Sequence, residues 1–342
     1  MPKPEHILVI RLSAMGDVAM TVPVIRALMN KHPNVKVTVL TRPFFAPMFR
    51  DITNTTVYAA NVKNEHKGIL GLYKLSKQLK RLNFDAIADL HNVLRSKLLR
   101  SFLIGIKSAH IDKGRKEKKA LISGQIFHQL KSTHQRYADV FEKLGFSLDL
   151  SNPAFPEKAV LKQDIFAITG NKSNTWIGIA PFAAHASKMY PLDMMEQVIK
   201  TLSKNYKIIL FGGGANEIDI LKLYENKFEN VISVAGKLNL EMELDLISNL
   251  DLMLSMDSGN AHLAAMLGIK VITIWGVTHP YAGFAPYNQP KDFQIISDRT
   301  QFPLIPTSVY GNKYPDEYEN AAASISPDSI VAKIEKTIST NI

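Results

Sequence analysis

The stretch ILVIRLSAMGDVAMTVPVIRALM, residues 7–29, decides the fold of the first part of this chain. Its first four residues form an apolar run rich in β-branched side chains, which is typical of a strand covered on both faces in a parallel sheet. Apolar residues then recur at helical spacing from Val22 to Leu28, and Pro23 is tolerated only in the first turn of a helix. The pattern predicts a strand, an irregular loop and a helix that begins near Thr21.

The loop of this unit contains Gly16 and Asp17. It follows the carboxyl end of a predicted parallel strand, which is where open α/β sheets bind their ligands. Asp17 is therefore a candidate functional acid. The alternative, which the sequence leaves open, is a carboxylate that only serves the loop or caps the next helix.

Short apolar runs alternate with helical patterns along the whole chain, as in α/β proteins with parallel sheets. We expect further strands at 35–40, 86–90, 176–180, 207–211, 231–234, 252–255 and 271–275. The length of 342 residues favours two domains, and a polar stretch with two prolines at 147–164 marks the connection. We expect domains at 1–155 and 156–325, followed by a final helix at 326–342.

Composition excludes several classes of protein. The hydrophobic fraction of 46% and the charged fraction of 21% are those of a soluble globular protein, and no apolar run has membrane-spanning length. The N-terminus does not have the pattern of a signal peptide. The chain has no cysteine, which excludes disulfides, thiolate metal sites and a cysteine nucleophile and is typical of a cytoplasmic protein.

The formal net charge of +10 predicts anionic partners. Basic residues crowd the stretch from Lys113 to Lys119, in which Glu117 is the one acidic residue. This stretch is either a binding surface or a solvated basic loop. Since the sequence has no zinc-finger spacing, RNA-binding aromatic pattern or usable helix-turn-helix signal, we do not expect nucleic acid as a partner.

Two loops that follow predicted strands have residues suited to a nucleotide sugar. In FGGGANE, Gly213 permits close approach of the backbone to a phosphate or ribose, and Glu217 can accept hydrogen bonds from ribose hydroxyls. The alternative is a plain turn with a helix-capping glutamate. Lys188 precedes another helix and would neutralise a departing diphosphate, or it is a solvated surface charge.

The segment SMDSGNAHL places a helix start directly after a buried strand. The free amides at Ser258, Gly259 and Asn260 form a ready anion site. Asp257 would repel a phosphate and therefore suits the hydroxyls of a neighbouring sugar, unless it is only a helix cap. His262 lies one turn into the helix, where a packing or orienting role fits better than proton transfer.

Several catalytic motifs are absent. The sequence has no Asp-x-Asp pair, no His-Glu-x-x-His, no Gly-x-x-x-x-Gly-Lys-Ser/Thr loop and no Gly-x-Ser-x-Gly. It also lacks the Gly-x-Gly-x-x-Gly fingerprint of dinucleotide-dependent dehydrogenases. We therefore expect neither a metal ion nor a cofactor.

Taken in order, RLSAMGDV, SKMYP, FGGGANE, AGKLNLEMELDLISNLDLMLSMDSGNAHLAAMLG and WGVTHP resemble the bacterial heptosyltransferases of lipopolysaccharide assembly, glycosyltransferase family 9. The resemblance spans nearly the whole chain. It implies a GT-B fold, in which two Rossmann-like domains with parallel sheets face each other across a cleft. The acceptor would bind the N-terminal domain and ADP-heptose the C-terminal one, and the last helix would pack back on the N-terminal domain.

The resemblance also implies roles for single residues. Asp17 matches the catalytic base that deprotonates the acceptor hydroxyl, and Lys188 matches the diphosphate-binding lysine. The matched donor-binding positions are Glu217 for the ribose, Leu238 for the adenine, Asp257 for the sugar, and Ser258, Gly259 and Asn260 for phosphate, with Gly213 and His262 beside them. The matched acceptor-binding positions are Lys113, Arg115, Lys116 and Lys118.

The function that follows is an inverting, metal-independent transfer of heptose from ADP-heptose to a Kdo- or heptose-bearing lipopolysaccharide core. Its partners would be an ADP-sugar donor and an anionic lipid-linked sugar acceptor, with peripheral contact to the inner face of the inner membrane. The alternative is a catalytically silent protein that binds a nucleotide sugar or an anionic glycan on the same fold.

Overall fold

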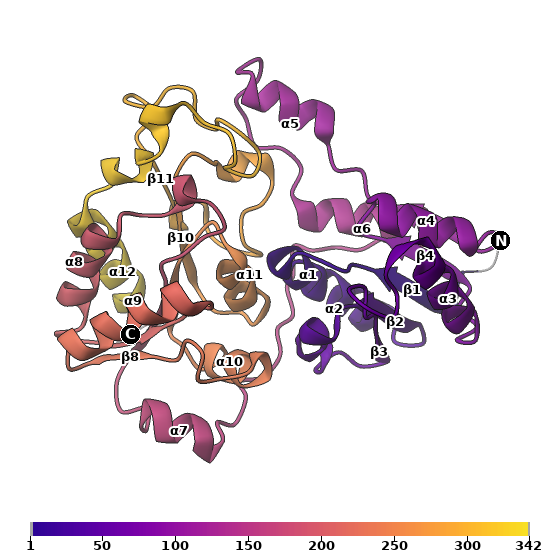
Figure 1. Ribbon diagram of the computed structural model, residues 1–342, viewed down its shortest axis with the longest axis horizontal. Coiled ribbons are helices and arrows are strands. Elements are labelled where there is room, and N and C mark those ends of the chain that lie inside the picture. The colour runs from indigo at the N-terminus through magenta and orange to yellow at the C-terminus, as the bar shows by residue number, and fades with distance from the viewer. Residues whose placement is uncertain (1–2, 341–342) are drawn as a thin grey trace. The chain divides into compact units, whose positions relative to one another are not determined.

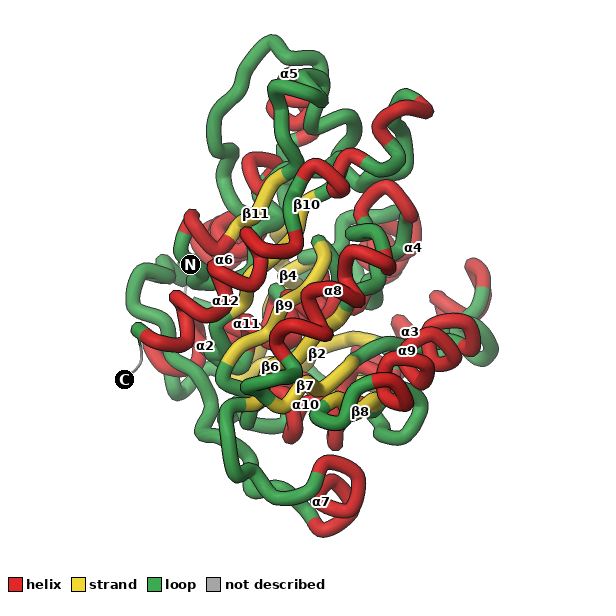
Figure 2. Tube along the Cα trace, turned by 90° about the vertical axis from the view of Figure 1, so that its left-hand side faces the viewer, coloured by secondary structure: helices red, strands yellow, loops and turns green. Residues whose placement is uncertain are grey.

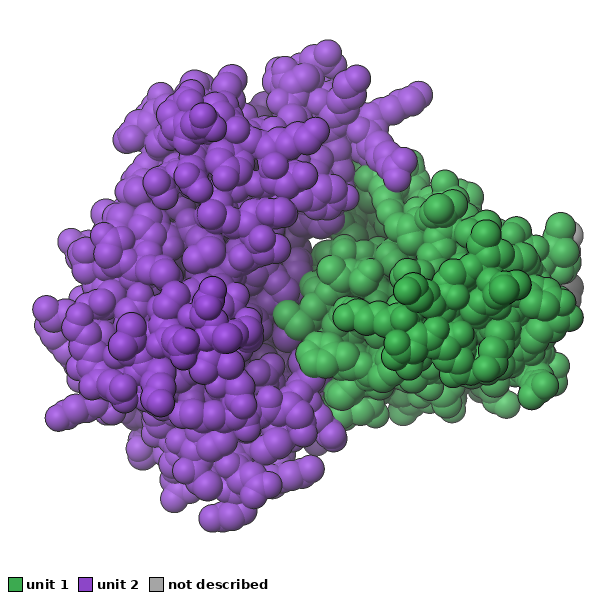
Figure 3. Space-filling model, viewed as in Figure 1, with its two compact units in different colours: residues 1–113, 131–155 green, residues 114–130, 156–342 purple. Residues whose placement is uncertain are grey.

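The computed structural model describes residues 3–340, which divide into two compact units (Figure 3). Unit 1 contains residues 3–113 and 131–155, and unit 2 contains residues 114–130 and 156–340. The expected domain boundary between residues 155 and 156 coincides with a border between the units. The expected first domain differs in one part, because residues 114–130 pack with unit 2.

Unit 1 is built around a five-stranded parallel sheet with the order β3-β2-β1-β4-β5. The predicted first strand is central, with Val9 beside Val39 on one side and Ala88 on the other. All three side chains are fully buried, in keeping with the continuous apolar run. The strands are β1 (His6–Ile10), β2 (Lys36–Thr41), β3 (Thr55–Ala59), β4 (Ala86–Asp89) and β5 (Lys107–His110); the helices are α1 (Met15–Ala19), α2 (Thr21–Lys31), α3 (Gly68–Lys80), α4 (Leu94–Phe102) and α6 (Thr133–Leu144) (Figure 1).

Unit 2 has a six-stranded parallel sheet with the order β11-β10-β9-β6-β7-β8 (Figure 2). Counted from its own first strand, this is the same Rossmann order as in unit 1, so the expected α/β class with two Rossmann-like sheets is confirmed. The strands are β6 (Trp176–Ala180), β7 (Lys207–Leu210), β8 (Val231–Ser233), β9 (Leu252–Met256), β10 (Val271–Trp275) and β11 (Gln294–Ile296); the helices are α5 (Arg115–Ile122), α7 (Gln163–Thr169), α8 (Leu192–Leu202), α9 (Ala215–Lys227), α10 (Leu240–Ile247), α11 (Gly259–Met266) and α12 (Pro327–Ser339).

The topology defines one special edge in each sheet. The order of strands reverses between β1 and β4 in unit 1 and between β6 and β9 in unit 2. Ligands of open α/β sheets bind beyond the carboxyl ends of the strands at such a switch point. Functional side chains are therefore expected directly after these four strands.

The predicted helix at Thr21 is confirmed, with Pro23 in its first turn. The expectation of an irregular loop around Gly16 and Asp17 is wrong, since Met15–Ala19 forms a short helix. The physical reason is a local cap: the amide of Ala14 donates to Oδ2 of Asp17 at 3.3 Å, which closes the first turn.

The final helix is present as α12 and packs against α8 within unit 2, through a core that includes Ile330 and Ile334. The expected packing on the first domain stays a prediction. Residues 341–342 of the expected helix lie outside the described residues. Among residues 3–340, no helix has both the length and the apolar character needed to cross a membrane.

Candidate active site

At the switch point of unit 1, Asp17 lies next to Arg11, the first residue after β1. The guanidinium of Arg11 forms an ion pair with Oδ2 of Asp17, the same oxygen that accepts the amide hydrogen of Ala14. Within the described part of the chain, these contacts leave Oδ1 able to accept another hydrogen bond. The side chain of Asp17 is 29% exposed, so a ligand can reach it.

Arg11 is itself fixed in place. It donates to the carbonyl of Leu90 at 2.8 Å, and its guanidinium carbon lies 5.9 Å from the ring centre of Tyr137. The hydroxyl of Tyr137 donates to the carbonyl of Asp17 at 3.3 Å. Three elements, β1, β4 and α6, therefore hold one carboxylate in a defined direction. The capping alternative is also observed, because Asp17 closes its own helix turn and remains accessible.

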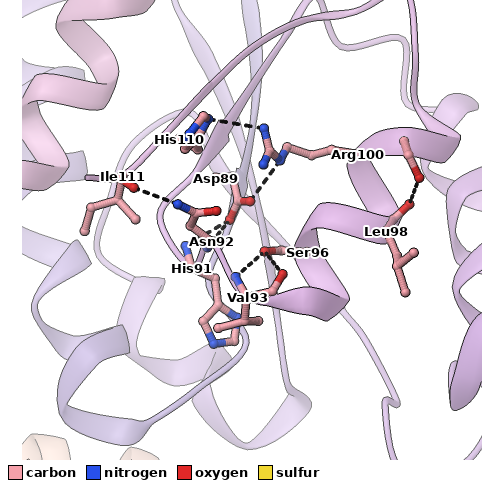
Figure 4. A network of polar contacts seen from close by, with 10 residues as sticks. Asp89, His91, Asn92, Val93, Ser96, Leu98, Arg100, His110 and Ile111 are labelled. Carbon is pink, nitrogen blue, oxygen red and sulfur yellow. Dashed lines mark hydrogen bonds and ion pairs between the residues drawn. The ribbon is translucent and has the colours of Figure 1, made fainter. Parts of the chain in front are cut away.

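Figure 4 shows the turn after β4, which is centred on the fully buried Asp89. Asp89 accepts the amide hydrogens of His91 at 3.0 Å and Asn92 at 2.8 Å, and it pairs with Arg100 at 3.0 Å. Asn92 adopts a left-handed φ of 43° and donates from its side chain to Ile111. This network makes the turn rigid and directs the ring of His91 away from Arg100.

His91 is a functional candidate that the sequence reasoning missed. Its side chain is 7% exposed, and burial, followed by the positive charges of Arg11 and Lys113, lowers its pKa to about 3. The negative charge of Asp17 acts in the opposite direction, so the two side chains share one electrostatic environment. Within residues 3–340, the buried Nδ1 of His91 has no hydrogen-bond partner. The sequence feature that could have indicated His91 is DLHN, residues 89–92, at the end of a buried strand.

A cavity of about 460 Å³ lies beyond the carboxyl ends of β2 and β3 in the same unit. Its lining combines two cations, Arg42 and Lys63, with Asn61 and the exposed ring of Phe44. Cations and an amide beside an aromatic ring suit an anionic, hydroxyl-bearing ligand.

At the switch point of unit 2, Lys188 and Asp257 lie together. Lys188 follows β6 and Asp257 follows β9; Nζ and Oδ2 are 2.8 Å apart, and the side chains are 13% and 11% exposed. The hydroxyl of Thr278 donates to the same oxygen of Asp257 at 2.8 Å. Lys188 is thus not a solvated surface charge, and the carboxylate of Asp257 contacts side chains rather than capping α11.

Backbone contacts fix the loop that contains Lys188. The hydroxyl of Ser187 donates to the carbonyl of Gly311 at 2.5 Å, and the amide of Val277 donates to the carbonyl of Ser187 at 3.0 Å. A Cβ atom at Gly276 would lie 2.2 Å from the Ser187 oxygen, and one at Gly311 would lie 2.5 Å from Cγ of Lys188. Only glycine fits at these two positions without moving the loop.

The other predicted donor residues lie along the same edge of the sheet. Glu217 is in the first turn of α9 and accepts the amide hydrogen of Gly213 at 2.7 Å, so it folds back over the glycine-rich turn as the capping alternative anticipated. Leu238 is half-buried between β8 and α10. Ser258 is the N-cap of α11 without a capping side-chain bond, and Gly259 and Asn260 form its first turn, so their amides have no intrahelical acceptor. His262 is buried inside α11, in keeping with a packing role.

The predicted acceptor residues are divided between the two units. Lys113 belongs to unit 1 and acts on His91, whereas Arg115, Lys116 and Lys118 belong to α5 of unit 2. Lys118 is 7% exposed, and its ammonium lies 3.8 Å from the ring centre of Phe284. Lys118 therefore secures α5 to unit 2 instead of presenting a charge to solvent; the helical spacing of the basic run turns this one residue inward.

Within residues 3–340, no group of three or more His, Asp or Glu side chains is arranged to hold a metal ion. The two switch points present a carboxylate held by an arginine in unit 1 and a lysine paired with a carboxylate in unit 2.

Comparison with known proteins finds relatives over most of the chain. The profile described as "Glycosyltransferase family 9 (heptosyltransferase)" matches residues 72–303. The "Lipopolysaccharide core heptosyltransferase OpsX" of Haemophilus influenzae is 27% identical over 299 residues, which cover 83% of this chain and 82% of the relative.

Two solved structures share the fold. A family 9 glycosyltransferase from Veillonella parvula superposes with a TM-score of 0.76 at 18% identity and covers 98% of both chains. The Escherichia coli heptosyltransferase WaaC, solved with ADP-2-deoxy-2-fluoro heptose, has a TM-score of 0.69 at 19% identity and covers 97% of this chain and 99% of its own.

Proposed function

This chain belongs to glycosyltransferase family 9, the heptosyltransferases, and we propose that it transfers heptose from ADP-heptose to an anionic lipopolysaccharide core acceptor with inversion and without a metal ion. The observation that carries the proposal is the arrangement at the two switch points. One presents an accessible carboxylate, and the other presents a lysine in a fixed loop. The name of the Haemophilus relative and the ligand of the WaaC structure support the acceptor and the donor.

Asp17 acts as the general base. A sugar hydroxyl is a poor nucleophile, and a carboxylate that accepts its proton as the bond to the anomeric carbon forms contributes about 10²–10⁴-fold to the rate. Oxygen attack from the face opposite the leaving ADP inverts the anomeric centre. The ion pair with Arg11 keeps Asp17 oriented for this step.

Lys188 stabilises the departing diphosphate. In the free chain its charge is balanced by Asp257. A bound diphosphate would replace Asp257 as the ionic partner of Lys188, and Asp257 would then accept hydrogen bonds from the hydroxyls of the sugar. Neither buried charge would be left without a partner. The amides at Ser258, Gly259 and Asn260 add hydrogen bonds to phosphate. Glu217 would accept from the ribose, and Leu238 would pack on the adenine.

This set makes a metal ion unnecessary in the proposal, because a lysine and helix amides supply the charge that a metal supplies in enzymes with an Asp-x-Asp pair. The anionic acceptor would bind at the cavity lined by Arg42, Asn61 and Lys63, together with Lys113. Of the α5 residues expected there, the exposed Arg115 and Lys116 remain candidates for acceptor contact, whereas the buried Lys118 does not.

The acceptor is part of a lipid, so we place the reaction at the cytoplasmic face of the inner membrane. The test is ADP release from ADP-heptose and a Kdo-lipid acceptor in the presence of a chelator. The proposal predicts that ADP is released when the chelator is present and that no ADP is released when the acceptor is omitted. Calorimetry that shows ADP binding with no transfer to any acceptor in a panel would instead identify a silent binding protein.

A further inference from the structure

We propose that the N-terminal turns of α3 and α4 form a docking surface for an anionic lipid bilayer. The inference rests on the proposed function in one respect, namely that the acceptor is lipid-linked. The apolar part of the surface consists of Ile69, Leu70 and Tyr73 on α3 and Leu94 on α4. Its basic part consists of the lysines and the arginine within the segments 63–77 and 94–97.

The apolar part of this surface is unusually exposed. Leu70 is 84% exposed, Leu94 74% and Ile69 63%. Large apolar side chains grouped on a soluble surface mark a site of contact with a partner or a membrane. α3 and α4 pack on each other in unit 1, so these exposed residues come from two neighbouring helices (Figure 1).

The exposure does not come from a loose segment. The buried His66 accepts the amide hydrogen of Asn61 at 3.0 Å with Nδ1 and donates to Gln78 of α3 at 2.9 Å with Nε2. A Cβ atom at Gly71 would lie 2.5 Å from the backbone of His66, so helix and loop are in close contact. Ile69 and Leu70 are therefore held outward by a packed support.

The charge of the surface selects an anionic partner. The same two segments contain the exposed cations Lys63, Lys67, Lys74, Lys77, Arg95 and Lys97. Their one acidic residue, Glu65, is paired with Lys74 at 2.9 Å. Exposed leucine and isoleucine between lysines is the combination by which proteins insert apolar groups among anionic headgroups. A protein partner would need an equally acidic and apolar face, whereas a bacterial inner leaflet supplies both properties.

The position of the surface fits a lipid-anchored substrate. In a parallel β-α-β unit the helix runs back from the carboxyl edge of the sheet, so α3 and α4 both begin at that edge. Asp17 and Arg11 follow β1 at the same edge. A sugar attached to a lipid could reach the carboxylate while its acyl chains stay in the bilayer, which avoids a cost of about 0.8 kcal/mol for each extracted CH₂ group.

The direct test is sedimentation of the full chain with vesicles of phosphatidylethanolamine and phosphatidylglycerol, without donor or acceptor. We expect binding that weakens with salt and is absent from phosphatidylcholine vesicles. Ile69→Ser with Leu70→Ser, and separately Lys67→Glu with Lys97→Glu, should each lower the partition coefficient at least about tenfold. Lys200→Glu with Lys204→Glu makes the same change of charge on exposed residues at the end of α8 and should bind as the parent does.

Turnover separates this inference from the proposed function. The Ile69→Ser and Leu70→Ser variant should lose activity on acceptor embedded in vesicles and keep it on a deacylated, soluble acceptor. A chain that transfers no sugar can still be scored by sedimentation. The inference is overturned if the parent does not bind anionic vesicles, if both surface variants bind like the parent, or if light scattering shows a dimer that Leu70→Ser dissolves.

Discussion

The substitution Gly276→Ala should disable donor binding without touching any proposed ligand of the donor. Its Cβ atom would lie 2.2 Å from the carbonyl oxygen of Ser187, whereas ordinary contacts begin at 3.4 Å. The loop must therefore retreat by more than about 1 Å, and it would lose the 3.0 Å hydrogen bond from Val277. Lys188 is the next residue, so the diphosphate-binding charge moves with the loop.

Overpacking costs about 1–3 kcal/mol and the lost hydrogen bond about 1 kcal/mol, so we expect the free energy of unfolding to fall by about 2–4 kcal/mol. A misplacement of this size lowers kcat/KM by about 10²-fold. The assays are calorimetric titration with ADP, ADP release during turnover, and unfolding in urea.

Gly178→Ala is the matched control for stability. A Cβ atom there would lie 2.5 Å from Cδ1 of Leu250 in the core of the same unit. This variant should lose a comparable amount of stability and still bind ADP as the parent does. If Gly276→Ala keeps the parent affinity for ADP, or if Gly178→Ala loses as much affinity, the loop does not position Lys188 for the donor.

Two further predictions concern buried charges. The side chains of Lys188 and Asp257 are only 13% and 11% exposed, so Lys188→Met and Asp257→Asn should each lower the free energy of unfolding by about 3 kcal/mol. The double variant should lose less than the sum of the two single losses. Additive losses in urea unfolding would mean that the pair is not coupled. His279 is buried, and desolvation, followed by the positive charge of Arg299, lowers its pKa to about 4 from 6.5. The unfolded chain therefore binds more protons below pH 6.5, and stability falls as the pH drops, by about 2 kcal/mol at pH 5 for this residue. In His279→Asn, Oδ1 can replace Nδ1 as the acceptor for the amide of Tyr281. The variant should therefore lose about 2 kcal/mol less stability than the parent between pH 7.5 and 5. A pH dependence of the free energy of unfolding equal to that of the parent would refute this role of His279.

The sequence predicts all central strands of both sheets but only one of the four edge strands, β8. Seven of the ten strands after the first were expected or overlap an expected run, and most of their residues are buried. The three that were missed, β3, β5 and β11, are edge strands with almost no fully buried residues. Apolar periodicity reports burial, so a strand that is half in water leaves little signal.

The candidate site divides in the same way. Motif residues that follow central strands, such as Asp17 and Lys188, could be proposed as site residues because the end of a buried strand can be located from the sequence. His91 was missed because its importance depends on Arg11 and Asp17, which are far away in the chain. Lys118 was misplaced because a run of like charges does not show which side of its helix is buried.

The central claim is that Asp17 is the base of the transfer reaction. Asp17→Asn keeps the shape of the side chain and an oxygen for Arg11, but it removes the ability to accept a proton. In an assay with ADP-heptose and a Kdo-lipid acceptor in the presence of a chelator, we predict that the kcat of Asp17→Asn for ADP release is about 10²–10⁴-fold below that of the parent chain. The affinity of the variant for ADP should be unchanged. A kcat close to that of the parent chain would contradict the account.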